Sequence, residues 1–123
     1  ALLALLGNEP GADRVARRLS DCVISAVNLA EVFSKTLQYS QSLDAVAAQI
    51  RRLQIPTVGF GESLALRAGQ LHASALGSGL SLADWACLAL GAVMGATIVT
   101  ADRKWSKLGL AADIEQIRGG DGV

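Results

Sequence analysis

The sequence is poor in the residues that build metal sites from nitrogen and sulfur. Its 123 residues include two cysteines, Cys22 and Cys87, and one histidine, His72. The cysteines stand far apart and form no CxxC pair, which argues against both a zinc site and a disulfide framework. Two reduced thiols instead favour a reducing, cytoplasmic location.

Net charge and long apolar runs are also lacking. The 11 basic and 11 acidic residues give a formal net charge of zero, so bulk charge does not indicate a nucleic-acid partner. No apolar run reaches the roughly 18 residues needed to span a bilayer, and we expect no membrane-spanning segment. Hydrophobic residues make up 51% of the chain and charged residues 18%. This composition excludes intrinsic disorder and predicts one domain with a substantial core.

Helical and strand patterns alternate along the chain. Apolar residues recur at helical spacing in residues 28–40, 42–53, 62–77 and 81–95, and a short helix is expected over 101–109. Short β-branched or apolar stretches read as strands at 21–25, 55–60, 96–100 and 113–117. The opening ALLALL resembles the end of a strand that runs into a helix. The alternation predicts an α/β fold with a small, mostly parallel sheet.

Three acidic residues stand near the strand ends of this predicted fold. Glu31 comes just after strand 21–25, Asp102 just after strand 96–100, and Asp84 opens the helix that leads into the latter strand. In open α/β sheets the functional crevice lies outside the carboxyl ends of the strands. Mg²⁺ and Mn²⁺ prefer oxygen ligands. A metal site that acts on a phosphodiester is therefore one interpretation of the three acids.

Helix capping explains the same acids one at a time. Asn28 with Glu31, and Ser81 with Asp84, have the spacing of a capping box. Asp102 suits the N-cap of the short helix that follows it. A phosphatase or a DNA nuclease would use such acids as well. The residues alone leave these alternatives open.

The segments NLAEV, SLADWACLALG and TADRKWSKLG, in this order, resemble the PIN-domain family, specifically the VapC-type toxins of bacterial toxin–antitoxin pairs. The resemblance implies a three-layer α/β/α fold, with a small mostly parallel sheet flanked by helices, and a cytoplasmic ribonuclease that depends on Mg²⁺ or Mn²⁺. It implies catalytic and metal-binding roles for Glu31, Asp84 and Asp102, and an orienting, catalytic role for Thr100. The implied partners are an RNA substrate, a cognate antitoxin and a second copy of the chain.

The first aspartate of the family has no counterpart in this sequence. The family carries it in a pattern similar to D-x-S-A-L-L, and this chain begins at ALL. We expect a single PIN-like domain over residues 1–123 with a truncated first strand and a loose tail at 119–123. An aspartate about three residues upstream would complete the acidic set that hard-metal coordination favours. Without it, the alternative is a catalytically impaired module that binds protein partners.

Overall fold

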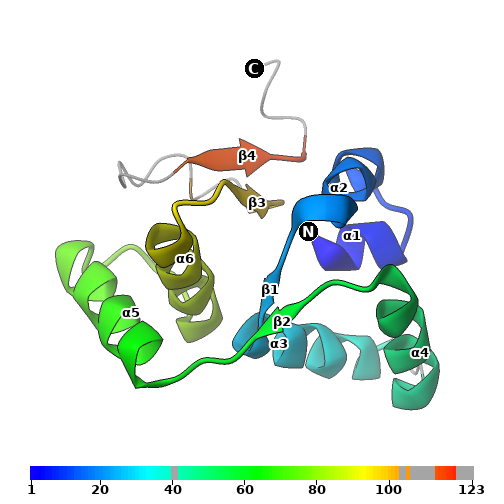
Figure 1. Ribbon diagram of the computed structural model, residues 1–123, viewed down its shortest axis with the longest axis horizontal. Coiled ribbons are helices and arrows are strands. Elements are labelled where there is room, and N and C mark those ends of the chain that lie inside the picture. Colours follow the sequence, from blue (N-terminus) through cyan, green and yellow to red (C-terminus); the bar gives the residue numbers. More distant parts are fainter. Residues whose placement is uncertain (40–41, 103–104, 106–112, 119–123) are drawn as a thin grey trace.

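The computed structural model describes residues 1–39, 42–102, 105 and 113–118. Helices surround short strands at the centre and along one side of the molecule (Figure 1). The helices are α1 (Leu2–Leu6), α2 (Ala12–Arg18), the 3₁₀ turn η1 (Leu19–Asp21), α3 (Ala26–Leu37), α4 (Leu43–Leu53), α5 (Glu62–Ser74) and α6 (Leu82–Met94). The strands are β1 (Ile24–Ser25), β2 (Thr57–Val58), β3 (Ile98–Thr100) and β4 (Ile114–Gln116).

The strands pair in parallel, in two separate pairs. Strand β1 pairs with β2, with Ile24 opposite Thr57, and β3 pairs with β4, with Ile98 opposite Ile114. Parallel pairing requires a crossover connection, and α3 and α4 supply it between β1 and β2. The predicted α/β fold with parallel strands flanked by helices is confirmed. Within the described residues, however, the strands form two small sheets where one was expected.

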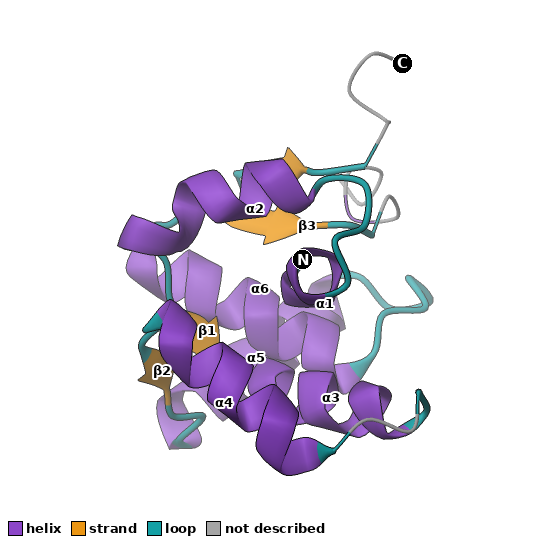
Figure 2. Ribbon diagram, turned by 90° about the vertical axis from the view of Figure 1, so that its right-hand side faces the viewer, coloured by secondary structure: helices purple, strands orange, loops and turns teal. Residues whose placement is uncertain are grey.

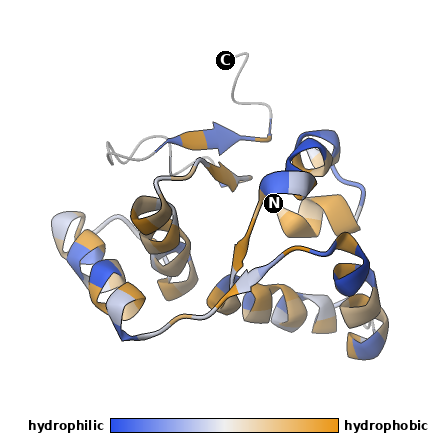
Figure 3. Cartoon of the chain, viewed as in Figure 1, coloured by the Kyte–Doolittle hydropathy of each residue, from blue (hydrophilic) through white to orange (hydrophobic). Residues whose placement is uncertain are grey.

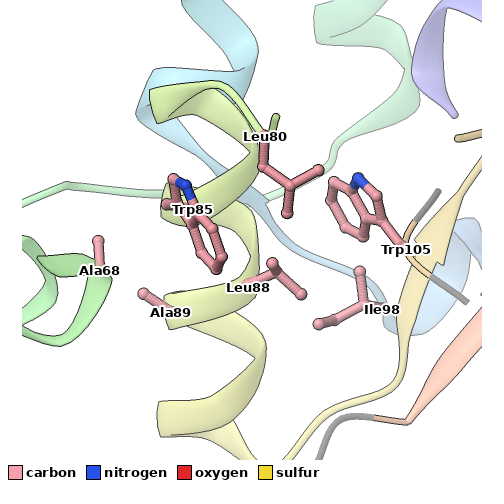
Figure 4. Close-up of a cluster of buried hydrophobic side chains, with 7 residues drawn as sticks. All are labelled: Ala68, Leu80, Trp85, Leu88, Ala89, Ile98 and Trp105. Atoms are coloured by element: carbon pink, nitrogen blue, oxygen red, sulfur yellow. The ribbon is translucent and has the colours of Figure 1, made fainter. Parts of the chain in front are cut away.

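Helix α6 carries the central core of the molecule. It packs against α5, α3, β1 and β3, and most of it has the hydrophobic colour in Figure 3. Its side chains Trp85, Leu88 and Ala89 are almost completely buried. Figure 4 shows them between Ala68 of α5 on one side and Ile98 of β3 on the other. A helix that is apolar on most of its surface belongs in the interior.

Helix α1 connects the two halves of the fold. Leu2 packs in a cluster with Val32 of α3 and with α4, whereas Ala4 packs with residues of α2 and with Ile117, next to β4. Figure 2 shows α1 between β3 above it and α3 below it. The expectation that residues 1–6 end a strand was wrong, because Leu2–Leu6 are helical and bury apolar side chains toward both neighbours.

Hydrogen bonds at the helix starts decide the two capping boxes that the sequence predicted. Helix α3 begins before Asn28, at Ala26, because the Ser25 Oγ accepts a hydrogen bond from the Val27 N–H at 3.2 Å. Asn28 therefore lies inside the helix, and its interpretation as the capping partner of Glu31 was wrong. The capping box of Ser81 and Asp84 is confirmed, with hydrogen bonds of 2.9 and 3.2 Å.

Two further expectations concern the C-terminal part of the chain. Most of the short helix expected over 101–109, and the whole tail at 119–123, lie outside the described residues. Strand β4 lies where the sequence predicted the last strand. Among the described helices, none combines the length and the apolar character that a membrane crossing requires.

Candidate active site

Glu31 and Asp84 lie on two neighbouring helices that a side-chain hydrogen bond joins. The Asn28 Nδ2 on α3 donates to the main-chain oxygen of Ala83 on α6, at 3.0 Å. Glu31 follows Asn28 by three positions, so both side chains lie on the same side of α3. Asp84 directly follows Ala83 in the first turn of α6. The bond therefore joins the helices at the level of both carboxylates.

The thiol of Cys87 lies within electrostatic range of both acids. Burial raises the pKa of Cys87 to about 11, and the negative charges of Asp84 and Glu31 add to the rise. Glu31 belongs to the other helix, so its effect on Cys87 places its charge near the interface between α3 and α6. We call Asn28, Glu31, Asp84 and Cys87 the acidic site.

Each carboxylate of the acidic site already has a local partner. The Asp84 Oδ2 accepts the Ser81 N–H at 2.9 Å, which orients the carboxylate at the start of α6. The Glu31 carboxylate lies 3.9 Å from the Lys35 ammonium, and the two side chains are 36% and 49% exposed. An exposed ion pair of this kind stabilises a fold very little. Lys35 therefore presents only a weak obstacle to a cation that binds Glu31.

The main chain of Asp102 is fixed by residues of β3 and β4. Its N–H donates to the Thr100 Oγ1 at 3.0 Å, and its carbonyl oxygen accepts from the Gln116 Nε2 at 3.1 Å. Arg14 of α2 in turn donates from Nη1 to the Gln116 carbonyl oxygen at 2.6 Å. Thr100 is buried. Asp102 therefore stands at a rigid strand end, two residues after the last residue of β3.

The structure brings the three predicted acids together only in part. Glu31 and Asp84 lie on α3 and α6, two helices in contact, whereas Asp102 lies on neither helix and follows strand β3. In the part of the chain that the structure describes, no group of three or more His, Cys, Asp or Glu side chains lies close enough to hold a metal ion. Glu31 also lies in the middle of α3, although the sequence placed it at the start of a helix.

The family model of the PIN domain matches residues 1–110, a range that contains all three acids and Thr100. The chain belongs to the PIN-domain family. PIN domains are generally metal-dependent nucleases, and RNA is a substrate consistent with the family. Neither the curated proteins nor the solved structures contain a significant match to the chain.

A divalent cation is the cofactor that PIN domains typically use, and the donors of the acidic site fit such an ion. Mg²⁺ keeps several waters and is usually bound through one or two carboxylates, which Glu31 and Asp84 supply. The Asn28 Oδ1 is a further oxygen donor, buried and without a hydrogen-bond partner. An all-oxygen set of this kind suits Mg²⁺ or Mn²⁺ better than zinc.

Sequence reasoning missed two members of the acidic site. Asn28 was assigned to a helix cap, because an Asn three residues before a Glu has the spacing of a capping box. Cys87 was considered only as a reduced thiol. Its position three residues after Asp84 on the same predicted helix was the available signal that the two side chains are neighbours.

Proposed function

We propose that this PIN domain is a metal-dependent endoribonuclease and acts as the toxin of a type II toxin–antitoxin pair, with Mg²⁺ or Mn²⁺ as its cofactor. Membership of a nuclease family supports the chemistry. The main support for the location of the site is the hydrogen bond from Asn28 to Ala83, because it holds the helices of Glu31 and Asp84 together. The toxin role extends the resemblance of the sequence motifs to VapC-type proteins.

The proposed roles are those that the resemblance to VapC-type proteins implies. Asp84 and Asp102 are metal ligands, and Glu31 binds the metal directly or through water. The cation, when bound, supplies an activated water and stabilises charge at the scissile phosphate. Ser81 orients the Asp84 carboxylate, and Thr100 fixes the main chain that carries Asp102.

Cleavage of a labelled RNA pool with Mn²⁺ tests this function. We expect Asp102→Asn and Glu31→Gln each to lower the cleavage rate by about 100-fold, since these variants keep the size of the side chain and remove its charge. Asp44→Asn and Glu62→Gln are matched controls, because both residues are exposed in the first turns of α4 and α5. Undiminished cleavage by either site variant, or cleavage that EDTA leaves unchanged, would overturn the proposal.

Binding of protein partners is a second function that exposed apolar side chains favour. Near the ends of α3 and α4, Leu37, Tyr39 and Leu43 are 57%, 72% and 42% exposed. A second group lies on or beside α5 and α6: Leu66, Leu76, Leu82, Val93 and Met94. Exposed apolar side chains in such number suit contact with a second copy of the chain and with an antitoxin segment.

The oligomeric state in solution tests the homodimer. We expect the protein to elute at twice its chain mass in size-exclusion chromatography with light scattering, and Leu37→Ser with Tyr39→Ser to shift it toward the monomer. A monomeric wild-type protein would exclude the homodimer. A dimer without any RNase activity would favour the alternative, a catalytically impaired module that binds protein partners.

A further inference from the structure

The amide nitrogen and the amide oxygen of the Asn28 side chain differ in their hydrogen bonding. Its nitrogen donates to the Ala83 carbonyl oxygen, whereas its oxygen is buried and has no hydrogen-bond partner. The assignment of nitrogen and oxygen is not ambiguous here, because only the NH₂ end can face a carbonyl. A buried polar atom without a partner costs free energy and calls for an explanation, such as a bound water or ion.

A purely structural role of Asn28 explains the hydrogen bond of its amide nitrogen but not its unpaired amide oxygen. The hydrogen bond to Ala83 holds the first turn of α6 against α3, but packing two helices does not require a buried acceptor, since an apolar side chain of similar shape packs as well. The unexplained oxygen belongs to a residue that lies one helical turn from Glu31 and is bonded to the residue before Asp84. Near two carboxylates, an additional oxygen is favourable when a cation lies among them.

We propose that Asn28 is a positioning residue with two tasks. Its amide nitrogen holds the first turn of α6 against α3, which sets the separation of Glu31 and Asp84. Its amide oxygen contacts a divalent cation beside these carboxylates, directly or through a bound water. The second task rests on the proposed function; the first does not need a metal.

Two substitutions separate the oxygen from the hydrogen bond. Asn28→Leu is close in size and removes both donor and acceptor, whereas Asn28→Asp keeps an oxygen and loses the donor to Ala83. Calorimetric titration of the complete chain with Mn²⁺ alone is the measurement. We expect Asn28→Leu to weaken Mn²⁺ binding by about tenfold, as loss of a group that orients metal ligands does, and Asn28→Asp to bind at least as tightly as the wild type.

A merely structural Asn28 would give a different pattern. Both variants lose the bond to Ala83, so both would then weaken Mn²⁺ binding alike, and this result overturns the role of the oxygen. Equal affinity of Asn28→Leu and the wild type overturns it too. Asn28→Ala takes the place of Asn28→Leu if circular dichroism shows that the leucine variant does not fold.

Hydrogen exchange without metal tests the first task independently. We expect the backbone amides of residues 82–86 to exchange faster in both Asn28→Leu and Asn28→Asp, because the first turn of α6 loses its link to α3. Unchanged exchange overturns this task. If the Asn28 variants change Mn²⁺ binding as expected but the wild type cleaves no RNA, only the proposed function is contradicted. A wild type that binds no Mn²⁺ contradicts the proposed cofactor together with the role of the oxygen.

Discussion

The Thr100 hydroxyl oxygen accepts a hydrogen bond from the backbone N–H of Asp102 at 3.0 Å. Thr100 is the last residue of β3 and is buried, so its hydroxyl is held in place by the strand around it. The same residue accepts the Ile117 N–H through its carbonyl oxygen at 3.0 Å. A buried threonine therefore fixes the direction in which the chain carries Asp102 away from β3.

Substitutions at Thr100 test whether this bond supports activity. Thr100→Val keeps the shape of the side chain but leaves the Asp102 N–H without its acceptor, and we expect RNA cleavage with Mn²⁺ to fall about tenfold. Thr100→Ser keeps the acceptor and should cleave at nearly the wild-type rate. In urea unfolding, the free energy of unfolding of each variant should fall by about 1 kcal/mol. In Thr100→Val the cause is the unpaired Asp102 N–H, and in Thr100→Ser it is the loss of a buried methyl group. Equal cleavage by the two variants would contradict this role of the hydroxyl.

Asp84 is expected to serve both the helix and the metal, and two substitutions distinguish these roles. Asp84→Asn keeps an oxygen that accepts the Ser81 N–H, so we expect its free energy of unfolding to stay within about 1 kcal/mol of the wild type. Asp84→Ala removes this acceptor and should be less stable than Asp84→Asn by about 1 kcal/mol. Cleavage should be lost in both, because both lack the charge.

The measurement is urea unfolding alongside the RNase assay for each Asp84 variant. If Asp84→Asn unfolds like the wild type and also cleaves like it, then capping is the whole role of Asp84. Ser81→Ala is the control, since it removes the other bond of the capping box and leaves the carboxylate charge unchanged.

The fold could be predicted to a large extent because hydrophobic periodicity is a local signal. The apolar pattern of 81–95 predicted α6, and the β-branched residues of 96–100 predicted β3. The first residues show the limit of such reasoning: ALLALL suits a buried strand or a buried helix equally. The helix forms because Leu2 and Ala4 pack against residues that are distant in the sequence.

The candidate site was less predictable, because its members depend on contacts between distant segments. Ser81 and Asp84 cap α6 locally, and their spacing was sufficient to predict this. The spacing of Asn28 and Glu31 looked the same, yet Ser25 takes the capping position and leaves Asn28 free to reach Ala83, 55 residues further along the chain. No local pattern distinguishes these two outcomes. The roles of Glu31, Asp84, Asp102 and Thr100 in catalysis remain predictions.

The raised pKa of Cys87 predicts a loss of stability in alkaline solution. The thiol has a pKa of about 11 in the folded protein, against an ordinary value of 9.0. Below about pH 9 the thiol is neutral in both states, and its contribution to stability is complete. As the pH rises from about 9 to about 11, the unfolded chain releases this proton first. The free energy of unfolding should therefore fall by up to about 3 kcal/mol.

Comparison of the wild type with Cys87→Ala isolates this contribution from other groups that titrate at alkaline pH. We expect urea unfolding curves of the two proteins to differ by a constant amount at neutral pH and to converge between about pH 9 and about pH 11. All measurements require a reducing agent, since both Cys22 and Cys87 are free thiols. A difference that does not depend on pH would show that Cys87 is not shielded from water as the structure indicates.

Gly91 allows α6 and β3 to pack closely together. This contact positions β3, the strand that precedes Asp102. A Cβ at this position would lie 2.5 Å from the Ile98 Cγ1 and 2.6 Å from its Cδ1, and Ile98 is only 4% exposed. Gly91→Ala should therefore destabilise the protein by about 1 to 3 kcal/mol in urea unfolding, as overpacking does. Gly69 of α5 is the matched control, since a Cβ there meets nothing within 4 Å. Gly69→Ala should stabilise by about 0.5 to 1 kcal/mol.

A double substitution shows whether the contact with Ile98 is the cause. In an Ile98→Ala background the crowded atoms are absent, so Gly91→Ala should cost much less than it does in the wild type, and the two changes should not be additive. If Gly91→Ala costs the same in both backgrounds, the destabilisation arises elsewhere. If Gly91→Ala and Gly69→Ala both stabilise, helix propensity outweighs packing at both positions, and α6 does not need a glycine to approach β3.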